Sequence, residues 1–368
     1  MSNKVKYLHL MRNDKFLKAY IEFINKNLDK NEHKFIIIDG ADEREIPFPK
    51  YSNVKPWISK GKRIKNTKIR YFLFLLQYPF LLLYLLMHSI GRQQIYFHGL
   101  FDPRNIIFLF IFRFLLKKSN WCMWGGDLYC YENRNYNLLK NRIWYRVEDY
   151  VKGNFYGYIT QIKGDYKLAK LWYRAKGNYF YSFMYPSNMY KAVDLIYSKE
   201  SNNYLNIQIG NSADSSNNHL EILEKLKKYK NIKIYCPLSY GDSKYAKYVG
   251  DKGKEIFGDN FIPMFDFLEY NEYLKFLSTI DIAIFAHNRQ QAVGNIMSLL
   301  SLKKTVYLKE KVTTYEMLQN LGVVVKSFDK FDNLEKLDEN ILLENKEIIK
   351  KRFSKERLIE DLTNLFND

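Results

Sequence analysis

Few cysteines occur in this sequence, and none of them is spaced for pairing. Among 368 residues there are 3 cysteines, Cys122, Cys130 and Cys236, and their spacing fits neither a disulfide framework nor a zinc site. The first residues, MSNKVKYLHLM, lack the basic start, apolar core and small-residue cleavage site of a signal peptide. We therefore expect a reduced, cytosolic protein.

Several familiar catalytic signatures are also missing. The chain has no Walker A lysine loop, no G-x-G-x-x-G after its first predicted strand and no serine nucleophile elbow. These absences argue against an NTPase, a dehydrogenase and a serine hydrolase. No set of residues has the spacing of a metal-ligand cluster, so we expect no metal site.

Acidic residues are outnumbered by basic ones, 40 to 58, which gives a formal net charge of +18. This charge attracts polyanions, so nucleic acid, nucleotide phosphates and anionic lipid head groups are candidate partners. Tyrosine and phenylalanine are abundant, at 31 and 26 residues, and their rings suit base stacking, sugar stacking or a membrane interface. Composition leaves these alternatives open, and scattered lysines are also typical of a solvated surface.

The first half of the chain predicts a parallel sheet. Strand and helix patterns over residues 4–39 make a βαβ unit. Two further predicted strands end directly before His98 and before Gly125-Gly126-Asp127. Ligands of parallel sheets bind at the carboxyl ends of the strands, so His98 and Asp127 are candidate catalytic groups. Gly-Gly-Asp is also common turn chemistry, and a single histidine is often structural.

A second series of strands and helices follows an irregular stretch at 181–203. Its predicted strands are 205–209, 232–236, 260–264, 281–285 and 305–308. We place the domain boundary in the irregular stretch, which gives domains at 1–190 and 191–368, the second with a terminal helix at 345–368. The expected fold is α/β, with two doubly wound Rossmann-like domains that face a cleft.

Two polar loops of the second domain have the layout of an anion site. The first is Gly210-Asn211-Ser212, between a predicted strand and a helix that starts near Ser216 or Asn217. The second loop contains the residues Arg289, Gln290, Gln291 and Gly294 and also precedes a helix. Helix N-termini present free N–H groups to phosphate, and arginine can bind phosphate in a bidentate manner. Together the loops predict a diphosphate site, although Ser, Asn and Asp are also ordinary helix caps.

Three more residues are candidates for nucleotide contacts. Tyr240 lies after the second predicted strand of this domain, between the two loops. A bound nucleotide needs an apolar slot for its base and an acceptor for its ribose hydroxyls, which Phe265 and Glu269 can provide. The alternatives are a core position for Phe265 and a first-turn helix position for Glu269.

A basic stretch at 51–70 runs directly into the apolar segment YFLFLLQYPFLLLYLLMH at 71–88. The segment is close to the shortest length that crosses a bilayer, and Gln77 and Pro79 interrupt it. The pattern favours a buried helix, then an interfacial helix that docks on a membrane, and least a membrane span. Cations beside an aromatic, leucine-rich helix favour an anionic leaflet, so we expect binding to anionic vesicles through 51–88.

The segments GNSADSSNNH, PLSYGD, FLEYNEYL and HNRQQAVGNI, in this order, resemble glycosyltransferase family 56, the TDP-N-acetylfucosamine:lipid II N-acetylfucosaminyltransferases or 4-alpha-L-fucosyltransferases. The segments HGLFDP and WGGDLYCYE extend the similarity into the first half of the chain. The resemblance implies a GT-B fold, with the acceptor bound by the first domain and the nucleotide sugar by the second. It also implies a metal-independent reaction on a polyprenyl-diphosphate-linked glycan.

The leading hypothesis is therefore a glycosyltransferase at the cytoplasmic face of the inner membrane, attached peripherally. It moves a deoxyaminosugar of the N-acetylfucosamine type from a nucleoside-diphosphate donor, TDP, in bacterial surface polysaccharide synthesis. Asp127 is the first candidate for the catalytic base and His98 the second, and in a retaining reaction Asp127 only orients substrate. The expected donor site, without metal or cofactor, comprises Gly210, Asn211, Ser212, Tyr240, Phe265, Glu269, Arg289, Gln290, Gln291 and Gly294.

Three alternatives stay open at this point. An O-antigen or capsule glycosyltransferase with another nucleotide-sugar donor would carry much the same motifs. A nonenzymatic nucleic-acid-binding protein would account for the charge and the aromatics, and it predicts binding with a steep salt dependence. A sugar-nucleotide isomerase would share the architecture. The leading hypothesis, in contrast, expects no nucleic-acid partner.

Overall fold

The computed structural model describes residues 5–38, 50–59, 66–190 and 204–367. It divides into two compact units, which are Met1–Ser187 with Leu358–Asp368, and Asn188–Arg357. We call them the N-terminal unit and the C-terminal unit. Part of the stretch in which the sequence predicts the domain boundary, 191–203, lies outside the described residues.

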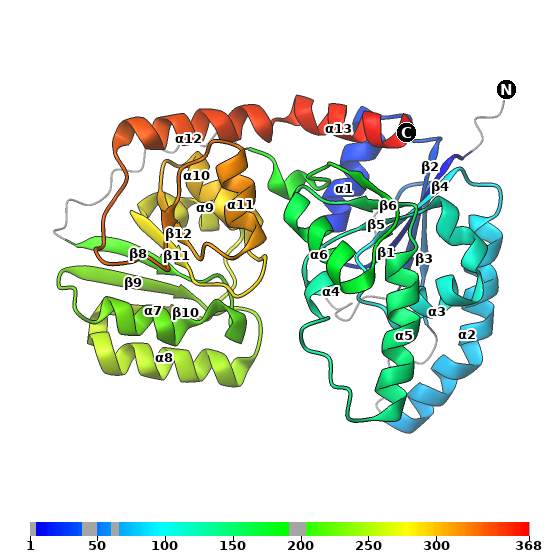
Figure 1. The fold of residues 1–368 in the computed structure, drawn as a ribbon, viewed down its shortest axis with the longest axis horizontal. Helices are drawn as coiled ribbons and strands as arrows, with labels where there is room; N and C mark the ends of the chain where they lie inside the picture. Colours follow the sequence, from blue (N-terminus) through cyan, green and yellow to red (C-terminus); the bar gives the residue numbers. More distant parts are fainter. Residues whose placement is uncertain (1–4, 39–49, 60–65, 191–203, 368) are drawn as a thin grey trace. The chain divides into compact units, whose positions relative to one another are not determined.

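The N-terminal unit is built on one parallel sheet (Figure 1). Within the described residues the strand order is β3-β2-β1-β4-β5-β6-β7, and all neighbours are parallel. The strands are β1 (Tyr7–Arg12), β2 (His33–Ile38), β3 (Val54–Trp57), β4 (Gln94–His98), β5 (Ser119–Cys122), β6 (Gly157–Ile159) and β7 (Asn178–Phe180). The chain reverses its direction of travel between β1 and β4, as in a doubly wound sheet.

Side chains alternate along each strand, so they point to both faces of this sheet, and both faces are buried. On β1, Leu8 and Leu10 join a core cluster with Leu81 and Leu85, whereas His9 faces the other side. The helical elements of this unit, with 3-10 helices written η, are α1 (Lys15–Asn27), α2 (Thr67–Ser89), α3 (Pro103–Ile111), η1 (Arg113–Lys118), α4 (Gly126–Tyr129), α5 (Leu139–Gly153) and α6 (Lys163–Tyr173), and η2 (Pro186–Asn188) lies at the boundary.

Helix α2 contains the apolar segment that the sequence predicts at 71–88. It begins at Thr67 because the Asn66 side chain accepts hydrogen bonds from the first backbone N–H groups. One face is buried in the core, as the favoured interpretation expected, but the opposite face is apolar too. Among the described residues we find no helix with the length and hydrophobicity needed to traverse a membrane. Residues 60–65 of the basic stretch lie outside the described residues.

The C-terminal unit is a second parallel sheet, with the order β10-β9-β8-β11-β12-β13 in the described residues. Its strands are β8 (Leu205–Ile209), β9 (Ile232–Pro237), β10 (Phe261–Met264), β11 (Ile282–Phe285), β12 (Thr305–Leu308) and β13 (Lys326–Ser327). Its helical elements are η3 (Ser215–Asn217), α7 (His219–Leu226), α8 (Ser243–Phe257), η4 (Gly258–Asn260), α9 (Tyr270–Thr279), α10 (Val293–Ser301), α11 (Thr313–Asn320) and α12 (Glu339–Arg352). Both units are doubly wound α/β sheets, which confirms the predicted fold class.

The end of the chain differs from the sequence-based expectation. Instead of one helix at 345–368, α12 is followed by a separate helix, α13 (Lys355–Asn367). The residues from Leu358 onward belong to the N-terminal unit, where the backbone carbonyl of Leu365 accepts a hydrogen bond from the Tyr96 hydroxyl at 3.2 Å. The predicted division placed this end in the second domain, because contacts between residues so distant in sequence leave no local pattern.

Candidate active site

Three loops meet at the carboxyl edge of the C-terminal sheet. They follow β8, β9 and β11, and β8 pairs with both of the other strands. The strand order reverses between β8 and β11, which is the place where open α/β sheets bind their ligands. The two predicted anion loops, after β8 and after β11, therefore lie on either side of this switch point.

Gly210 shapes the first loop. Its φ is +60°, and a Cβ at this position would lie 2.4 Å from Nε2 of His219 and 2.8 Å from Oδ1 of Asn217. Only glycine combines this left-handed backbone with such a close approach. The side-chain oxygen of the buried Asn217, Oδ1, occupies this space. It accepts hydrogen bonds from Asn211 N at 2.9 Å and from His287 Nε2 at 3.0 Å.

Asn217 and Asn218 thus link the loop after β8 to the loop after β11. Asn218 Nδ2 donates to Ala286 O at 2.6 Å and to Asn288 Oδ1 at 2.8 Å. In return, Asn288 N donates to Ser216 O at 3.2 Å. From the sequence, Asn217 was predicted only as the start of a helix and Asn218 was not singled out, although their spacing from Gly210 was an available signal for a structural role.

Gln291 connects the amide and hydroxyl groups of the predicted site. Its Oε1 accepts from Ser216 Oγ at 2.8 Å, and its Nε2 donates to Asn211 Oδ1 at 3.2 Å and to Ser212 Oγ at 3.5 Å. Asn211 Nδ2 in turn donates to the Tyr240 hydroxyl at 2.7 Å. The structure therefore brings four of the predicted donor-site residues together, namely Asn211, Ser212, Tyr240 and Gln291.

Arg289 supplies a positive charge at the same place. Its Nη2 lies 3.2 Å from Oδ2 of Asp214, and the arginine side chain is 25% exposed. Burial alone would raise the pKa of Asp214, but hydrogen bonds from Ser216 and the charge of Arg289 outweigh it, so this pKa is lowered. Asp214 therefore carries a negative charge, and Arg289 contacts it through Nη2. The sequence analysis missed Asp214.

The remaining predicted donor residues spread along the same edge. Gln290 O accepts a hydrogen bond from Arg289 Nη1 at 3.3 Å, and Gly294 lies in the first turn of α10. Phe265 and Glu269 follow β10, which is separated from β8 by β9. Phe265 is 51% exposed, so it is not the core residue of the alternative interpretation. A ring that stacks on a base must be accessible in this way. Glu269 is the N-cap residue of α9, one position before the first-turn position that the alternative interpretation expected.

In the N-terminal unit, Asp127 lies at the carboxyl edge but is only 1% exposed. Its Oδ2 accepts from Trp121 Nε1 at 2.6 Å and from Leu100 N at 2.9 Å, and its Oδ1 accepts from Trp124 N at 2.9 Å. These donors come from β5 and from the loops after β4 and β5. The carboxylate therefore holds the two loops together.

His98 lies at the end of β4, next to β5, and both of its ring nitrogens have partners. Nδ1 is 2.8 Å from the Tyr185 hydroxyl, and Nε2 is 3.1 Å from Nδ1 of His9, whose Nε2 is 3.0 Å from Nδ1 of His33. Burial lowers the pKa of His98 to about 3. These three imidazoles are neutral at pH 7 and satisfy one another within the protein.

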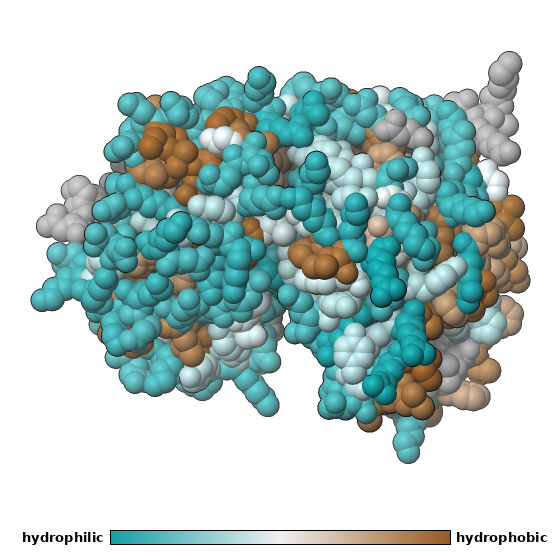
Figure 2. Space-filling view, in the orientation of Figure 1, coloured by the Kyte–Doolittle hydropathy of each residue, from teal (hydrophilic) through white to brown (hydrophobic). Residues whose placement is uncertain are grey.

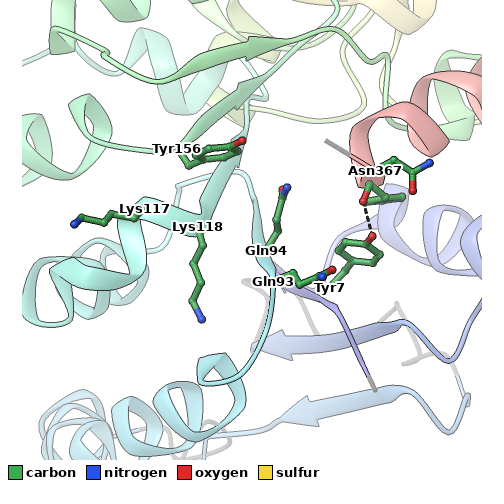
Figure 3. Close-up of a pocket in the computed structure, with 8 residues that line it drawn as sticks. Tyr7, Gln93, Gln94, Lys117, Lys118, Tyr156 and Asn367 are labelled. Atoms are coloured by element: carbon green, nitrogen blue, oxygen red, sulfur yellow. Dashed lines mark hydrogen bonds between the residues drawn. The ribbon is translucent and has the colours of Figure 1, made fainter. Parts of the chain in front are cut away.

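A separate cavity of about 380 Å³ lies in the N-terminal unit (Figure 3). Tyr7 begins β1, Gln94 begins β4, and Lys118 and Tyr156 precede β5 and β6, so the cavity lies at the amino edge of the sheet. Lys118 Nζ already donates to Ser89 O at 2.9 Å. Since parallel sheets bind ligands at the opposite edge, we do not assign this cavity to the reaction.

Within the described residues, no group of three or more His, Cys, Asp or Glu side chains has a geometry that could hold a metal ion. The expectation of a metal-independent reaction stays a prediction.

Known proteins with similar sequence and structure identify the family. Residues 86–350 match the model of 4-alpha-L-fucosyltransferase glycosyl transferase group 56. Anabaena Alr3699/HepE in complex with UDP and glucose has a TM-score of 0.66 at 12% identity, with 99% of this chain and 100% of that chain covered. The N-terminal domain of Candida albicans trehalose-6-phosphate phosphatase has a TM-score of 0.65 at 10% identity, with 99% and 97% covered.

Sucrose-phosphate synthase from Thermosynechococcus elongatus has a TM-score of 0.63 at 10% identity, with 98% of each chain covered. At these identities the likeness concerns the fold, which is GT-B. The family match spans most of the chain and includes the loops described above. The chain therefore belongs to glycosyltransferase group 56, the 4-alpha-L-fucosyltransferase family, and is a transferase enzyme.

Proposed function

We propose that this glycosyltransferase moves a deoxyaminosugar of the N-acetylfucosamine type from a TDP donor to a polyprenyl-diphosphate-linked glycan, in the synthesis of a bacterial surface polysaccharide. The observation that carries the donor half is the hydrogen-bonded pair of loops at the β8–β11 switch point, with Arg289 beside them. HepE, which shares the fold, was solved with UDP, so a nucleoside diphosphate is a suitable ligand for such a site.

The chemistry that these loops can support is stabilisation of the leaving group. When the bond between sugar and diphosphate breaks, negative charge grows on the terminal phosphate. Arg289 and the amide groups of Asn211 and Gln291 are held in place before the reaction, so they stabilise that charge without reorganising. In our proposal these groups make a bound metal unnecessary.

The N-terminal unit, in the same proposal, binds the acceptor. Asp127 and His98 lie at its carboxyl edge, but their polar atoms are occupied by protein groups. Either acts on a substrate hydroxyl only if the acceptor displaces one of those partners. We therefore assign Asp127 first to holding the loops, and general-base catalysis or orientation of the substrate becomes an outcome of the tests below.

The lipid-linked acceptor and the attachment to an anionic membrane at the cytoplasmic face are supported by α2. Its side chains Ile69, Phe72, Leu76, Phe80, Leu83 and Met87 are each at least 50% exposed. Their spacing of three and four residues places them on one stripe of the helix. Figure 2 shows hydrophobic residues gathered along this side of the N-terminal unit. A stripe of this kind suits an interfacial helix.

An O-antigen or capsule transferase with another nucleotide sugar is the second candidate, and HepE with UDP is the observation that favours it. A thermal-shift panel of TDP, UDP, GDP and CDP, each with and without EDTA, tests the proposal. A ligand that binds the folded state raises the melting temperature by mass action. We expect TDP to give the largest shift, with no effect of EDTA. Failure of every nucleotide to stabilise the protein would contradict the donor assignment.

A further inference from the structure

Three apolar side chains are exposed where α5 begins. Leu138 is 52% exposed, Leu139 is 72% exposed and Ile143 is 56% exposed. The sequence analysis did not single out this segment, because its polar neighbours hide the pattern. Buried α5 residues such as Val151 lie toward the other end of the helix, in the core cluster. The exposed group therefore belongs to the free end of α5, away from the core.

This end and the start of α2 both lie toward the carboxyl edge of the sheet, although β2, β1 and β4 separate the strands that precede them. Helix α2 follows β3 and α5 follows β5, and in a parallel sheet the helix that follows a strand begins at the carboxyl edge. Figure 1 shows both helices starting at the lower end of the N-terminal unit, and Figure 2 shows hydrophobic residues there. Helix α3 bridges them, since it packs on α5 and its Arg104 carbonyl accepts from the Tyr78 hydroxyl of α2 at 3.3 Å.

The charged residues that the structure describes at the starts of α2 and α5 are basic. Lys140, Arg142 and Arg146 are exposed on α5, and Lys68 is exposed in the first turn of α2. Neither helix has an acidic residue in its first turn. Apolar side chains among cations match the boundary between acyl chains and anionic head groups, whereas a second copy of this patch would bring like charges together.

We propose that the amino end of α5 is a second membrane contact, which together with α2 inserts the carboxyl edge of the N-terminal unit into an anionic leaflet. This inference rests on the proposed lipid-linked acceptor. Asp127 and His98 lie at the same edge, so the loops around them face the head-group plane. The contact then has an orienting role, because one helix alone leaves the molecule free to rotate about the axis of that helix.

A matched pair of substitutions tests this contact on the full chain. Leu139→Ser removes an apolar side chain from the proposed contact, and Leu171→Ser removes one from α6 that is 73% exposed, almost the same as Leu139. Partitioning is measured by co-sedimentation with vesicles of phosphatidylcholine and phosphatidylglycerol. Leu139→Ser is expected to lower the partition coefficient about tenfold, because a leucine leaves the acyl region, and Leu171→Ser to leave it unchanged.

Three outcomes would overturn the inference. Equal effects of Leu139→Ser and Leu171→Ser would show that the α5 end is not a contact. Loss of binding in Phe80→Ser, with full binding in Leu139→Ser, would leave α2 as the membrane element and keep the proposed function. Absence of vesicle binding by the unaltered protein would remove both membrane statements. The nucleotide panel is independent of all three, so a failure of the donor assignment would be recognised separately.

Discussion

The two sheets treat the polar groups at their carboxyl edges in opposite ways. In the C-terminal unit, Arg289, Asp214 and Tyr240 are at least partly exposed, and the amides of Asn211 and Gln291 are held beside them by hydrogen bonds. In the N-terminal unit, Asp127 and His98 are buried, and each polar atom has a protein partner. In our proposal the first edge receives the diphosphate of the donor, whereas in the second edge Asp127 holds its own loops.

The difference teaches that a residue type at a strand end does not by itself identify a catalytic group. Both edges have glycine, amide and ionisable residues directly after parallel strands, and the sequence therefore favoured a functional site at each. The depth of burial separates them, and that depth is set by residues distant along the chain, such as Tyr185 beside His98.

Acidification should produce the largest difference in unfolding free energy between the two units. Burial lowers the pKa of His9 and His98 and brings that of His33 to about 4. The unfolded chain binds protons on these groups near pH 6.5, so it holds more protons than the folded chain, and stability falls as the pH drops below that value. Each group costs up to about 1.4 kcal/mol per pH unit until its folded pKa is reached.

The C-terminal unit has a similar liability in His219 and His287, whose pKa values burial lowers to about 4 and about 3. Burial also lowers the pKa of His88, so the N-terminal unit has four such groups against two, and we expect it to lose more unfolding free energy between pH 7 and pH 5. Urea titrations read by pulse-labelled hydrogen exchange on peptides from β1 and β8 measure each unit. A smaller loss of unfolding free energy in the β1 peptides than in the β8 peptides would contradict the neutral state of His9, His33 and His98.

Asp127→Asn tests whether the buried carboxylate is structural. An asparagine keeps the shape, but its NH₂ group faces donors that need an acceptor, so we expect the N-terminal unit to lose about 1.5–3 kcal/mol of unfolding free energy. Asp242→Asn is the control, because asparagine serves equally well as a helix cap at that exposed position. A general base would instead show turnover reduced about a hundred- to ten-thousand-fold at full stability.

Arg289→Ala should weaken binding of a nucleoside diphosphate by about 1.5–3 kcal/mol, the usual worth of a hydrogen bond to a charged group. The fold should be retained, because the side chain is partly exposed in a loop. Titration calorimetry with TDP measures the change, and Lys244→Ala, which removes an exposed cation from the start of α8, is the matched control. Equal affinities of the two variants would leave general charge attraction as the only role of Arg289.

Tyr240→Phe is expected to have the smallest effect. It removes the hydroxyl that accepts from Asn211 Nδ2, so the amide becomes less well oriented, and TDP affinity should fall by about 0.5–1.5 kcal/mol. The ring stays, so the stability of the C-terminal unit should be nearly kept. A loss larger than that of Arg289→Ala would reverse the order of importance that we assign to charge and amide orientation.

Local patterns were enough to predict the doubly wound fold and most of the strands, but not the short strands β3, β7 and β13. Gly210, Arg289 and Gln291 lie directly after strands, where periodicity changes and where a parallel sheet gathers its loops. The role of Asn217 depends on its contact with His287, and the end of α13 depends on its contact with Tyr96. Contacts between segments so far apart have no signature in the order of residues.

The exposure of apolar side chains on α2 and α5 could be predicted from the sequence only in part. The sequence showed that α2 is apolar all round, which predicts burial, but it did not show that the stripe around Phe80 is exposed. For α5, Leu139 lies between polar residues, and only the structure shows that it points away from the core.

Hydrogen exchange with and without TDP tests the central claim most directly, because it reads both carboxyl edges in one experiment. The account predicts slower exchange on TDP binding in peptides that cover Gly210–Asn218 and His287–Ala292, and no change in peptides that cover His98–Asp127. Equal protection at both edges, or protection at His98–Asp127 alone, would contradict the assignment of the donor site to the C-terminal unit.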